Sequence, residues 1–315
     1  MHAPANQEER TSTRFIATKG DAGKRLDLWL CVKLKKTSRR QVKKMLDDGR
    51  VFLNGKRVVI AGWEVNAGDT AEIATAEHAH ARARQRVAQH HLHIYFEDRD
   101  LIVVEKPAGL VTAASDEREG DGTLVDLVRG YLHRRFRKSA GSFVKPLHRL
   151  DRDTSGVVVF AKSKEGGKLD EQFRRHAIRR RYAAVVEGVV RQDAGIVDAP
   201  LEKGTFSGGR KVKIAKTGEG NSARTRFTIR ERYSKITLLE IEVETGRTHQ
   251  IRVHMASIGH PLVGDKLYGS HVKFSRHALH ATLLEFRHHE TRKKLEFQSP
   301  LPDDLRQLID RLRRG

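Results

Sequence analysis

The sequence has almost no cysteine and no long apolar run. Cys31 is the sole cysteine among 315 residues, so an intramolecular disulfide cannot form and a reducing compartment is indicated. The polar N-terminal segment lacks the apolar stretch of about 7–15 residues found in signal peptides. The longest apolar runs, such as residues 156–161, fall well short of the roughly 20 residues that span a membrane. We therefore expect a cytoplasmic protein without a transmembrane helix.

Acidic residues are also scarce relative to basic ones. The chain carries 61 lysines and arginines against 40 aspartates and glutamates, and its formal net charge of +21 is spread along its length. The hydrophobic fraction of 38% is nevertheless typical of a globular protein rather than of a disordered basic tail. A basic globular protein is expected to bind a polyanion, and without a membrane segment we favour nucleic acid over lipid.

Changes in composition divide the chain into four segments. Residues 1–17 are polar without periodicity and are predicted to be a flexible tail. Residues 18–76 are predicted to form a small α+β unit, and residues 77–92, rich in His, Ala, Arg and Gln, a basic linker. Residues 93–315 combine short strand-like segments with helical patterns at irregular spacing. This mixture favours an α+β domain over a doubly wound parallel sheet.

The small unit contains clear start and stop signals. Apolar residues at three- and four-residue spacing from Leu26 predict an amphipathic helix. Ser38 and Gln41 predict a capping box at the start of a second helix. The Asn54-Gly55 dipeptide predicts a hairpin with a tight turn. The unit is therefore expected to contain two helices followed by a small sheet.

The second predicted helix concentrates positive charge. Residues 33–44 contain seven basic side chains and no acidic one. A helix start with this charge suits phosphate, and such binding is expected to depend strongly on salt. An ordinary solvated basic face would have the same composition, so charge alone leaves both interpretations open. The candidate RNA-binding residues on this helix are Arg39, Arg40, Lys43 and Lys44.

Four short motifs narrow that choice. They are Arg25-Leu-Asp27, Ser38-Arg-Arg40, Gly49-Arg-Val51 and Asn54-Gly-Lys56. Together with the predicted helix pair and hairpin, their order resembles the small RNA-binding domain named after ribosomal protein S-four. The resemblance implies that residues 18–76 bind structured RNA.

The most informative stretch is His148-Arg-Leu-Asp-Arg-Asp-Thr-Ser-Gly156, which leads into an apolar segment. From the residues alone it is a charged turn before a buried strand, with Gly156 allowing a close bend. Asp151 and Asp153 could be a metal-binding pair or turn-capping carboxylates. The whole run closely resembles the catalytic motif of the RluA-type pseudouridine synthases, in which the aspartate at the position of Asp151 is the essential nucleophile.

The resemblance extends, in the order typical of that family, to several other segments. They are residues 97–110, 181–188, 222–227, 244–254, 259–269 and 276–281. It implies a catalytic domain built on a mixed, largely antiparallel sheet. Residues 111–115, Val-Thr-Ala-Ala-Ser, depart from the Val-His-Pro-like sequence of many relatives. An RNA contact by that loop is therefore not carried over.

The implied reaction breaks the bond between uracil and ribose, rotates the freed base and rejoins it through a ring carbon, without cofactor or metal. Asp151 would act as a nucleophile or as a base on the sugar, and both routes stay open. An adjacent guanidinium would keep this carboxylate ionised, and by resemblance we assign that role to Arg247. Tyr182 would stack on the uracil and hydrogen-bond or shuttle a proton. The alternatives are a surface strand arginine for Arg247 and a core aromatic for Tyr182.

A uridine in folded RNA must be flipped out of its stack to react. By resemblance, Arg149 would fill the vacated place, which suits a planar cation. His148 is expected to order the loop rather than to transfer protons, and Ile251 to line the base pocket. Five arginines within residues 174–181 form either a track for the RNA backbone or a solvated face.

The sequence therefore predicts a monomeric RNA pseudouridine synthase that binds structured RNA and uses neither cofactor nor metal. Large-subunit ribosomal RNA, free or in a ribosomal precursor, is the leading substrate, and transfer RNA is the alternative. A non-catalytic RNA-binding ribosome-assembly factor would be a different class of function. The combined presence of Asp151, Tyr182 and Arg247 argues against that class, because RNA binding alone does not require these three residues.

Overall fold

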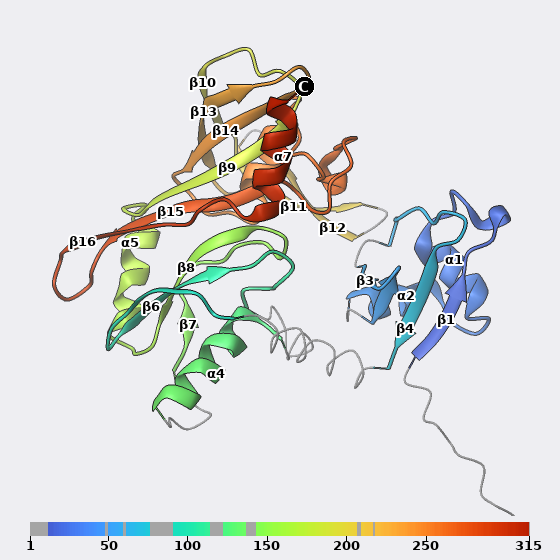
Figure 1. Cartoon of the computed structure of the whole chain (residues 1–315), viewed down its shortest axis with the longest axis horizontal. Helices are drawn as coiled ribbons and strands as arrows, with labels where there is room; N and C mark the ends of the chain where they lie inside the picture. Colours follow the sequence, from blue (N-terminus) through green and yellow to red (C-terminus); the bar gives the residue numbers. More distant parts are fainter. Residues whose placement is uncertain are drawn as a thin grey trace, which may run out of the picture. The chain divides into compact units, whose positions relative to one another are not determined.

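The computed structural model describes most of the chain, namely residues 12–47, 50–58, 61–75, 91–113, 122–136, 143–206, 209–216 and 218–314. The chain forms two compact units, one made mainly of residues 1–86 and the other of most of residues 87–315 (Figure 1). The predicted linker over residues 77–92 lies almost wholly outside the described residues. Within the described ranges, no helix is long and apolar enough to cross a membrane.

The first unit is a four-stranded antiparallel sheet with two helices. Its elements are β1 (Ser12–Ile16), α1 (Leu26–Lys33), α2 (Arg39–Asp47), β2 (Val51–Leu53), β3 (Lys56–Arg57) and β4 (Thr70–Ala74), with sheet order β1-β4-β2-β3. The predicted capping box is present, since Ser38 Oγ accepts from the Gln41 N–H at 3.3 Å and Gln41 Oε1 accepts from the Ser38 N–H at 2.7 Å. Asn54 and Gly55 have φ values of 50° and 73°, as the predicted tight turn requires.

Strand β1 corrects the prediction of a flexible tail for residues 12–16, whereas residues 1–11 of that tail lie outside the described residues. Residues 12–16 pair with β4, where Phe15 lies opposite Ala71, and the Phe15 ring packs against the core of the unit. The polar N-terminal half of this strand gives no clear apolar alternation, so periodicity does not reveal it. Pairing with β4, a contact distant in sequence, determines its conformation.

The core of the first unit lies between its helices and its sheet. Leu26, Trp29 and Leu30 of α1 are buried, at the three- and four-residue spacing seen in the sequence. They pack with Val42 and Leu46 of α2. The basic residues of α2 lie on the opposite, exposed side of the helix.

The second unit is built on a mixed, largely antiparallel sheet, which confirms the predicted fold class. Its strands are β5 (Ile94–Glu97), β6 (Leu101–Lys106), β7 (Lys145–Pro146), β8 (Ser155–Ala161), β9 (Arg179–Glu187), β10 (Ala194–Asp198), β13 (Arg224–Arg232), β14 (Ile236–Val243), β15 (Leu279–Arg287) and β16 (Lys294–Gln298). The order is β10-β13-β14-β9-β15-β8-β6-β5, with β7 beside β8 and β16 beside β15. Strands β15 and β8 run parallel, whereas β9 is antiparallel to both of its neighbours.

Helices and a further hairpin complete this unit. They are α4 (Leu124–Phe136), α5 (Asp170–Arg174), α6 (Gln250–Ser257), α7 (Asp303–Arg313), and the pair β11 (Leu201–Phe206) and β12 (Gly209–Ile214). All of β8 is buried, because Val158 packs on the face covered by α4 and Val159 on the opposite face. Helix α7 packs against β9 and β14 (Figure 1).

Gly156, at the start of β8, has φ 125°, and a Cβ there would lie 2.3 Å from the carbonyl oxygen of Ala281. The close bend predicted at Gly156 is therefore present.

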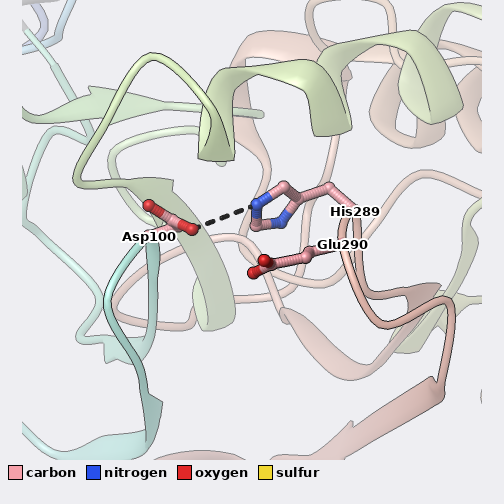
Figure 2. Close-up of side chains that lie close together, drawn as sticks. All are labelled: Asp100, His289 and Glu290. Carbon is pink, nitrogen blue, oxygen red and sulfur yellow. Dashed lines mark hydrogen bonds and ion pairs between the residues drawn. The ribbon is translucent and has the colours of Figure 1, made fainter.

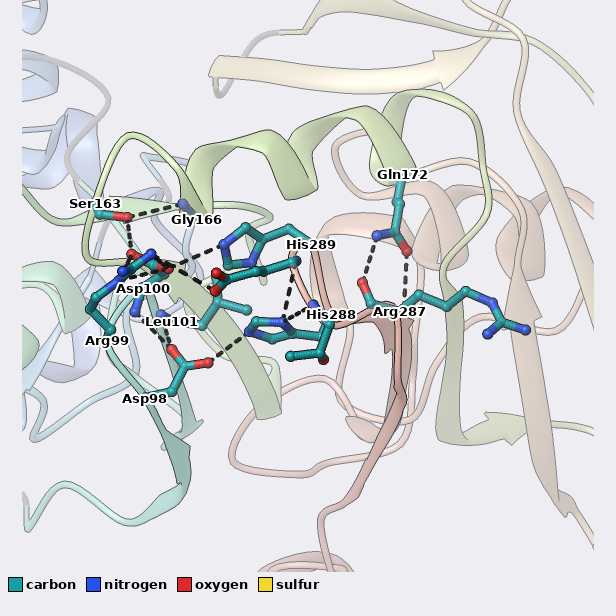
Figure 3. Close-up of polar contacts among 12 residues, drawn as sticks. Asp98, Arg99, Asp100, Leu101, Ser163, Gly166, Gln172, Arg287, His288 and His289 are labelled. Atoms are coloured by element: carbon teal, nitrogen blue, oxygen red, sulfur yellow. Dashed lines mark hydrogen bonds and ion pairs between the residues drawn. The ribbon is translucent and has the colours of Figure 1, made fainter.

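Two histidine–aspartate pairs fasten the β15–β16 turn to the β5–β6 turn (Figure 3). His288 Nε2 lies 2.7 Å from Asp98 Oδ2, and His289 Nε2 lies 3.2 Å from Asp100 Oδ2. The backbone N–H of Thr291 donates to His288 Nδ1, so we assign the ring proton to Nε2, which donates it to Asp98. These bonds fix the start of β6, whose other end reaches the candidate active site.

Candidate active site

The candidate site is centred on the loop of residues 150–154, which enters β8. The loop is immobilised because its successive carbonyl groups all accept hydrogen bonds. The donors are Thr112 Oγ1 to Leu150, the Thr154 N–H to Asp151, the Gly109 N–H to Arg152 and Arg276 Nη1 to Asp153, at 2.9, 3.1, 2.9 and 2.9 Å. The Asp151 side chain is thus carried by a backbone with little freedom to move.

Lys106, the last residue of β6, also hydrogen-bonds to this loop. Its fully buried ammonium donates to the carbonyl groups of Pro107, Leu110 and Arg152 at 2.9, 2.6 and 2.8 Å. Burial lowers the pKa of Lys106 to about 7, although the carboxylates of Asp153 and Asp151 oppose the shift. Three carbonyl acceptors satisfy the ammonium inside the protein.

Arg252 of α6 is the guanidinium beside Asp151. Its Nη1 donates to Asp151 Oδ2 at 3.2 Å, and its Nε and Nη2 donate to Asp265 at 2.6 and 2.9 Å. Asp265 is buried, whereas the Asp151 side chain keeps 22% of its exposure. Arg252 is therefore held by one carboxylate and presented to another that remains accessible.

This geometry corrects the assignment of Arg247. Arg247 is exposed, and its Nε donates to the carbonyl oxygen of Ser222 at 3.0 Å. It precedes α6, so it does not share the helical face from which Arg252 reaches Asp151. Arg247 was assigned by resemblance to the family motif, and Arg252, which the same motif contains, was missed.

The charge state of Asp151 follows from its neighbours. Burial would raise the pKa of Asp151, but the positive charges of His249, Arg252 and His277 outweigh burial and lower it. Burial also lowers the pKa of both histidines, so Arg252 supplies the positive charge that persists at neutral pH. Asp151 is therefore ionised near neutral pH.

Tyr182 and Ile251 lie in the core beside the loop. Tyr182 of β9 stands opposite Ile241 and Ala281 and, like Ile251 in the first turn of α6, is buried in the core that includes Leu150. Burial raises the pKa of Tyr182; nearby Arg180 opposes this rise and Asp151 adds to it. Tyr182 thus keeps its proton and lies within electrostatic range of Asp151.

His148 and Arg149 precede Asp151 on the same loop. His148 Nε2 accepts from the Val159 N–H at 3.3 Å, and its ring stacks on Phe173. Burial lowers the pKa of His148 to about 3, which leaves it neutral. These features support the expected role in ordering the loop. Arg149 is exposed, as a residue that enters RNA would need to be.

The candidate RNA-binding residues of the first unit lie on the outer side of α2. Arg39, Arg40, Lys43 and Lys44 are all exposed. Arg39 has a structural contact as well, because its Nε donates to the buried Asp27 at 2.8 Å. Arg40, Lys43 and Lys44 are thus the better probes of RNA binding.

The basic cluster before Tyr182 is only partly available for RNA. Arg174 and Arg175 form ion pairs with Glu171, and Arg179 and Arg181 with Glu242. Arg180 is buried, and its Nη2 donates to the Glu244 carbonyl oxygen at 3.1 Å. The five arginines therefore do not form one continuous solvated face.

One group in the described part of the chain has the spacing of metal ligands. Asp100, His289 and Glu290 each offer an atom within 4.8 Å of the others (Figure 2). Arg99, however, donates to both Asp100 oxygens, and Ser163 Oγ donates to Oδ1 at 2.7 Å. These hydrogen bonds satisfy the Asp100 carboxylate. The proximity of Asp100, His289 and Glu290 is thus accounted for by the packing of the two turns.

Two family models match the sequence. Residues 100–257 match the model described as RNA pseudouridylate synthase, and residues 24–70 match the model described as S4 domain. The first range contains Asp151, Tyr182 and Arg252, and the second contains most of the first unit, including α2.

Several known proteins are similar to this chain over nearly its whole length. The uncharacterized RNA pseudouridine synthase YlyB of Bacillus subtilis is 36% identical, covering 96% of this chain and 98% of that protein. Ribosomal large subunit pseudouridine synthase D of Nitrosomonas europaea is 33% identical, covering 99% and 91%, and synthase C of Escherichia coli strain K12 is 32% identical, covering 97% and 98%. The structure of human RNA pseudouridylate synthase domain containing 4 covers 74% of this chain and 95% of its own, with a TM-score of 0.58 and 23% identity. It has the same fold.

Proposed function

The chain belongs to the RluA family of RNA pseudouridine synthases, and from that premise we propose that it isomerises uridine in large-subunit ribosomal RNA through Asp151. The enzyme class, an RNA-modifying isomerase, follows from the family. The assignment of Asp151 is supported chiefly by one observation, its ion pair with Arg252, which Asp265 holds in turn.

Asp151 meets the two requirements of the reaction at the sugar. It is ionised at neutral pH, and its side chain remains partly accessible although the surrounding loop is rigid. An ionised carboxylate can attack the anomeric carbon as a nucleophile, or it can remove a proton from the sugar. In either route Arg252 keeps the carboxylate charged before the reaction begins.

The detached base needs a surface on which to rotate. Tyr182 supplies an aromatic ring, and its raised pKa keeps the hydroxyl protonated as a hydrogen-bond donor. Ile251 adds an apolar side chain from the first turn of α6. Arg149, exposed beside Asp151, would occupy the stack that the flipped uridine leaves.

Large-subunit ribosomal RNA is favoured as substrate by the names of similar proteins. Two relatives that match this chain over more than nine-tenths of its length are called ribosomal large subunit pseudouridine synthases. The S4 domain and the net charge of +21 supply RNA binding. Transfer RNA remains the alternative substrate in the experiment.

Tritium release tests the proposal directly. RNA labelled with tritium at carbon 5 of uracil loses the label when carbon 5 forms the new bond to ribose. Large-subunit ribosomal RNA and bulk transfer RNA would each be treated with the wild-type protein and with Asp151→Asn. We expect release from ribosomal RNA by the wild type, and a loss of at least about a thousandfold in the variant.

The affinity for RNA is the control in the same preparations. Asp151→Asn preserves size and polarity, so its dissociation constant for RNA should stay within about twofold of the wild-type value. Activity that survives in Asp151→Asn would refute the catalytic assignment. Release from transfer RNA alone would refute the proposed substrate while leaving the enzyme class intact.

A further inference from the structure

His249 has a backbone conformation that non-glycine residues rarely adopt. It is the N-cap residue of α6, with φ 55° and ψ 17°, in the left-handed region. Such conformations persist where the surrounding structure enforces them, and they concentrate at functional sites. In the sequence, His249 stands three residues before Arg252, the partner of Asp151.

The hydrogen bonds of His249 define which ring nitrogen carries the proton. Its Nδ1 lies 2.8 Å from the hydroxyl oxygen of Tyr268, and that oxygen also accepts from the Val212 N–H at 3.2 Å. Burial raises the pKa of Tyr268 to about 12, so the hydroxyl keeps its hydrogen. Because its oxygen already accepts from Val212, we assign that hydrogen to the bond with Nδ1. Burial lowers the pKa of His249, which makes the ring neutral. We therefore assign its own proton to Nε2.

The protonated nitrogen faces the reacting carboxylate without bonding to it. His249 Nε2 lies 3.9 Å from Asp151 Oδ2, which is longer than a hydrogen bond. Both side chains retain 22% exposure, so a ligand can reach them together. The charged groups that face His249 are Asp151, Arg252 and Asp265. Nε2–H is thus an accessible donor close to Asp151 that makes no hydrogen bond to its carboxylate.

We propose that His249 is a further catalytic residue, whose Nε2–H donates a hydrogen bond to the uracil base when that base separates from the sugar. This role rests on the proposed function and deepens it. Tyr268 is the positioning residue, because its hydroxyl fixes the tautomer of His249.

The chemistry needs such a donor in both routes open to Asp151. Either the carboxylate bonds to the anomeric carbon, or it takes a proton from the sugar. In both cases the bond between that carbon and N1 breaks with its electron pair going to the base. The negative charge then spreads onto the carbonyl oxygens of uracil, where a neutral N–H stabilises it. His249 transfers no proton; in the net reaction the proton lost from carbon 5 balances the one gained by N1.

Two substitutions with side chains of equal length distinguish the effect of the N–H donor from the effect of side-chain shape. His249→Gln retains an N–H donor, whereas His249→Met retains length but no donor, and both residues are disfavoured to a similar degree by the left-handed backbone. We expect His249→Met to lower the single-turnover rate of tritium release about 100-fold with unchanged RNA affinity. His249→Gln should keep the rate within about tenfold of wild type. Equal rates for the two variants would overturn the proposal.

The pH profile of the wild type gives a second, independent test. Lys106, whose pKa is about 7, titrates in the same range, so the wild-type profile is compared with that of His249→Gln, which keeps Lys106. A neutral donor gives the two proteins the same single-turnover profile from pH 7 to pH 8.5, whereas a charged imidazolium donor would cost the wild type alone about tenfold per pH unit above its pKa. Tyr268→Phe should lower the rate less than His249→Met does, again with RNA affinity unchanged. A fall in rate with rising pH in the wild type alone would overturn the neutral-donor role. Failure of the wild type itself to release tritium would instead refute the proposed function.

Discussion

At the scale of single residues, the charge of Asp151 depends on Arg252. The Arg252 guanidinium lies 3.2 Å from Asp151 and is fixed by the buried Asp265. We expect Arg252→Gln to lower the single-turnover rate of tritium release at least about 100-fold, because the enclosed carboxylate loses its permanent positive neighbour. Arg247→Gln removes an exposed guanidinium bonded to a backbone carbonyl, so its rate should stay within about threefold of wild type.

The pH dependence of these two variants provides the control. Without Arg252, burial dominates and the pKa of Asp151 rises, so the residual rate of Arg252→Gln should decline at a higher pH than the wild-type rate when the solution is acidified. Arg247→Gln should keep the wild-type profile. A larger loss of rate in Arg247→Gln than in Arg252→Gln would contradict the assignment.

The sequence predicted the right motif for this guanidinium and the wrong arginine. In a strand, Arg247 and Ile251 would share one face, since their spacing is even. The segment from Gln250 is instead a helix, and Arg252 within it and His249 at its N-cap both lie near Asp151. Arg247, like Asp151 and Tyr182, was assigned by resemblance to a family motif, and only the structure shows which of the two arginines in that motif reaches Asp151.

At the scale of elements, helix α2 carries the most readily tested RNA-binding surface. Arg40, Lys43 and Lys44 are exposed on it, and their replacement by Gln should weaken RNA binding. It should also reduce the slope of log affinity against log salt concentration by up to about 0.7 for each RNA phosphate that these side chains neutralise in the wild type. Filter binding at several salt concentrations measures both quantities. Arg39 is kept, because its bond to Asp27 supports the fold.

A triple variant of equal charge controls for the change in net charge. Arg306, Arg311 and Arg314 are exposed on or next to α7, and their replacement by Gln removes the same three charges. Single-turnover tritium release by the α2 variant at saturating enzyme should remain near the wild-type rate, since the reacting groups are untouched. An equal decrease of affinity and salt slope in both triple variants would contradict a specific role for α2.

Elements with local signals were predicted well, and elements that depend on distant contacts were not. The capping box of Ser38 and Gln41 and the Asn54-Gly55 turn are formed by neighbours in the sequence, and the structure confirms both. Strand β1 depends on pairing with β4, more than 50 residues away in the register that joins Phe15 to Ala71. No local pattern in residues 12–16 could reveal that pairing.

At the scale of the whole molecule, the buried histidines among the described residues all lie in the second unit. His277 and His280, for example, are buried in the second unit. Burial lowers the pKa of His280 to about 4 and that of His277 well below its usual value. Residues 12–75, which include the described part of the first unit, contain no histidine, but they contain both tryptophans, Trp29 and Trp63.

This division predicts that mild acid destabilises the second unit selectively. When the pKa of a histidine is lower in the folded than in the unfolded protein, protons bind the unfolded state preferentially. The free energy of unfolding is therefore highest above the unfolded pKa near 6.5, and it decreases as the pH falls toward the folded pKa. Between pH 7 and pH 5 the loss from His280 alone is about 2 kcal/mol, and the lowered pKa of His277 adds a loss of the same sign. In the first unit the pKa values of Asp21, Asp27 and Asp69 are lowered, for Asp21 chiefly by the hydrogen bond from Lys24, so these carboxylates titrate below this window. The urea midpoint from circular dichroism, dominated by the larger unit, should therefore fall from pH 7 to pH 5, whereas the midpoint from tryptophan fluorescence should stay nearly constant. A constant midpoint by circular dichroism would contradict the buried neutral histidines.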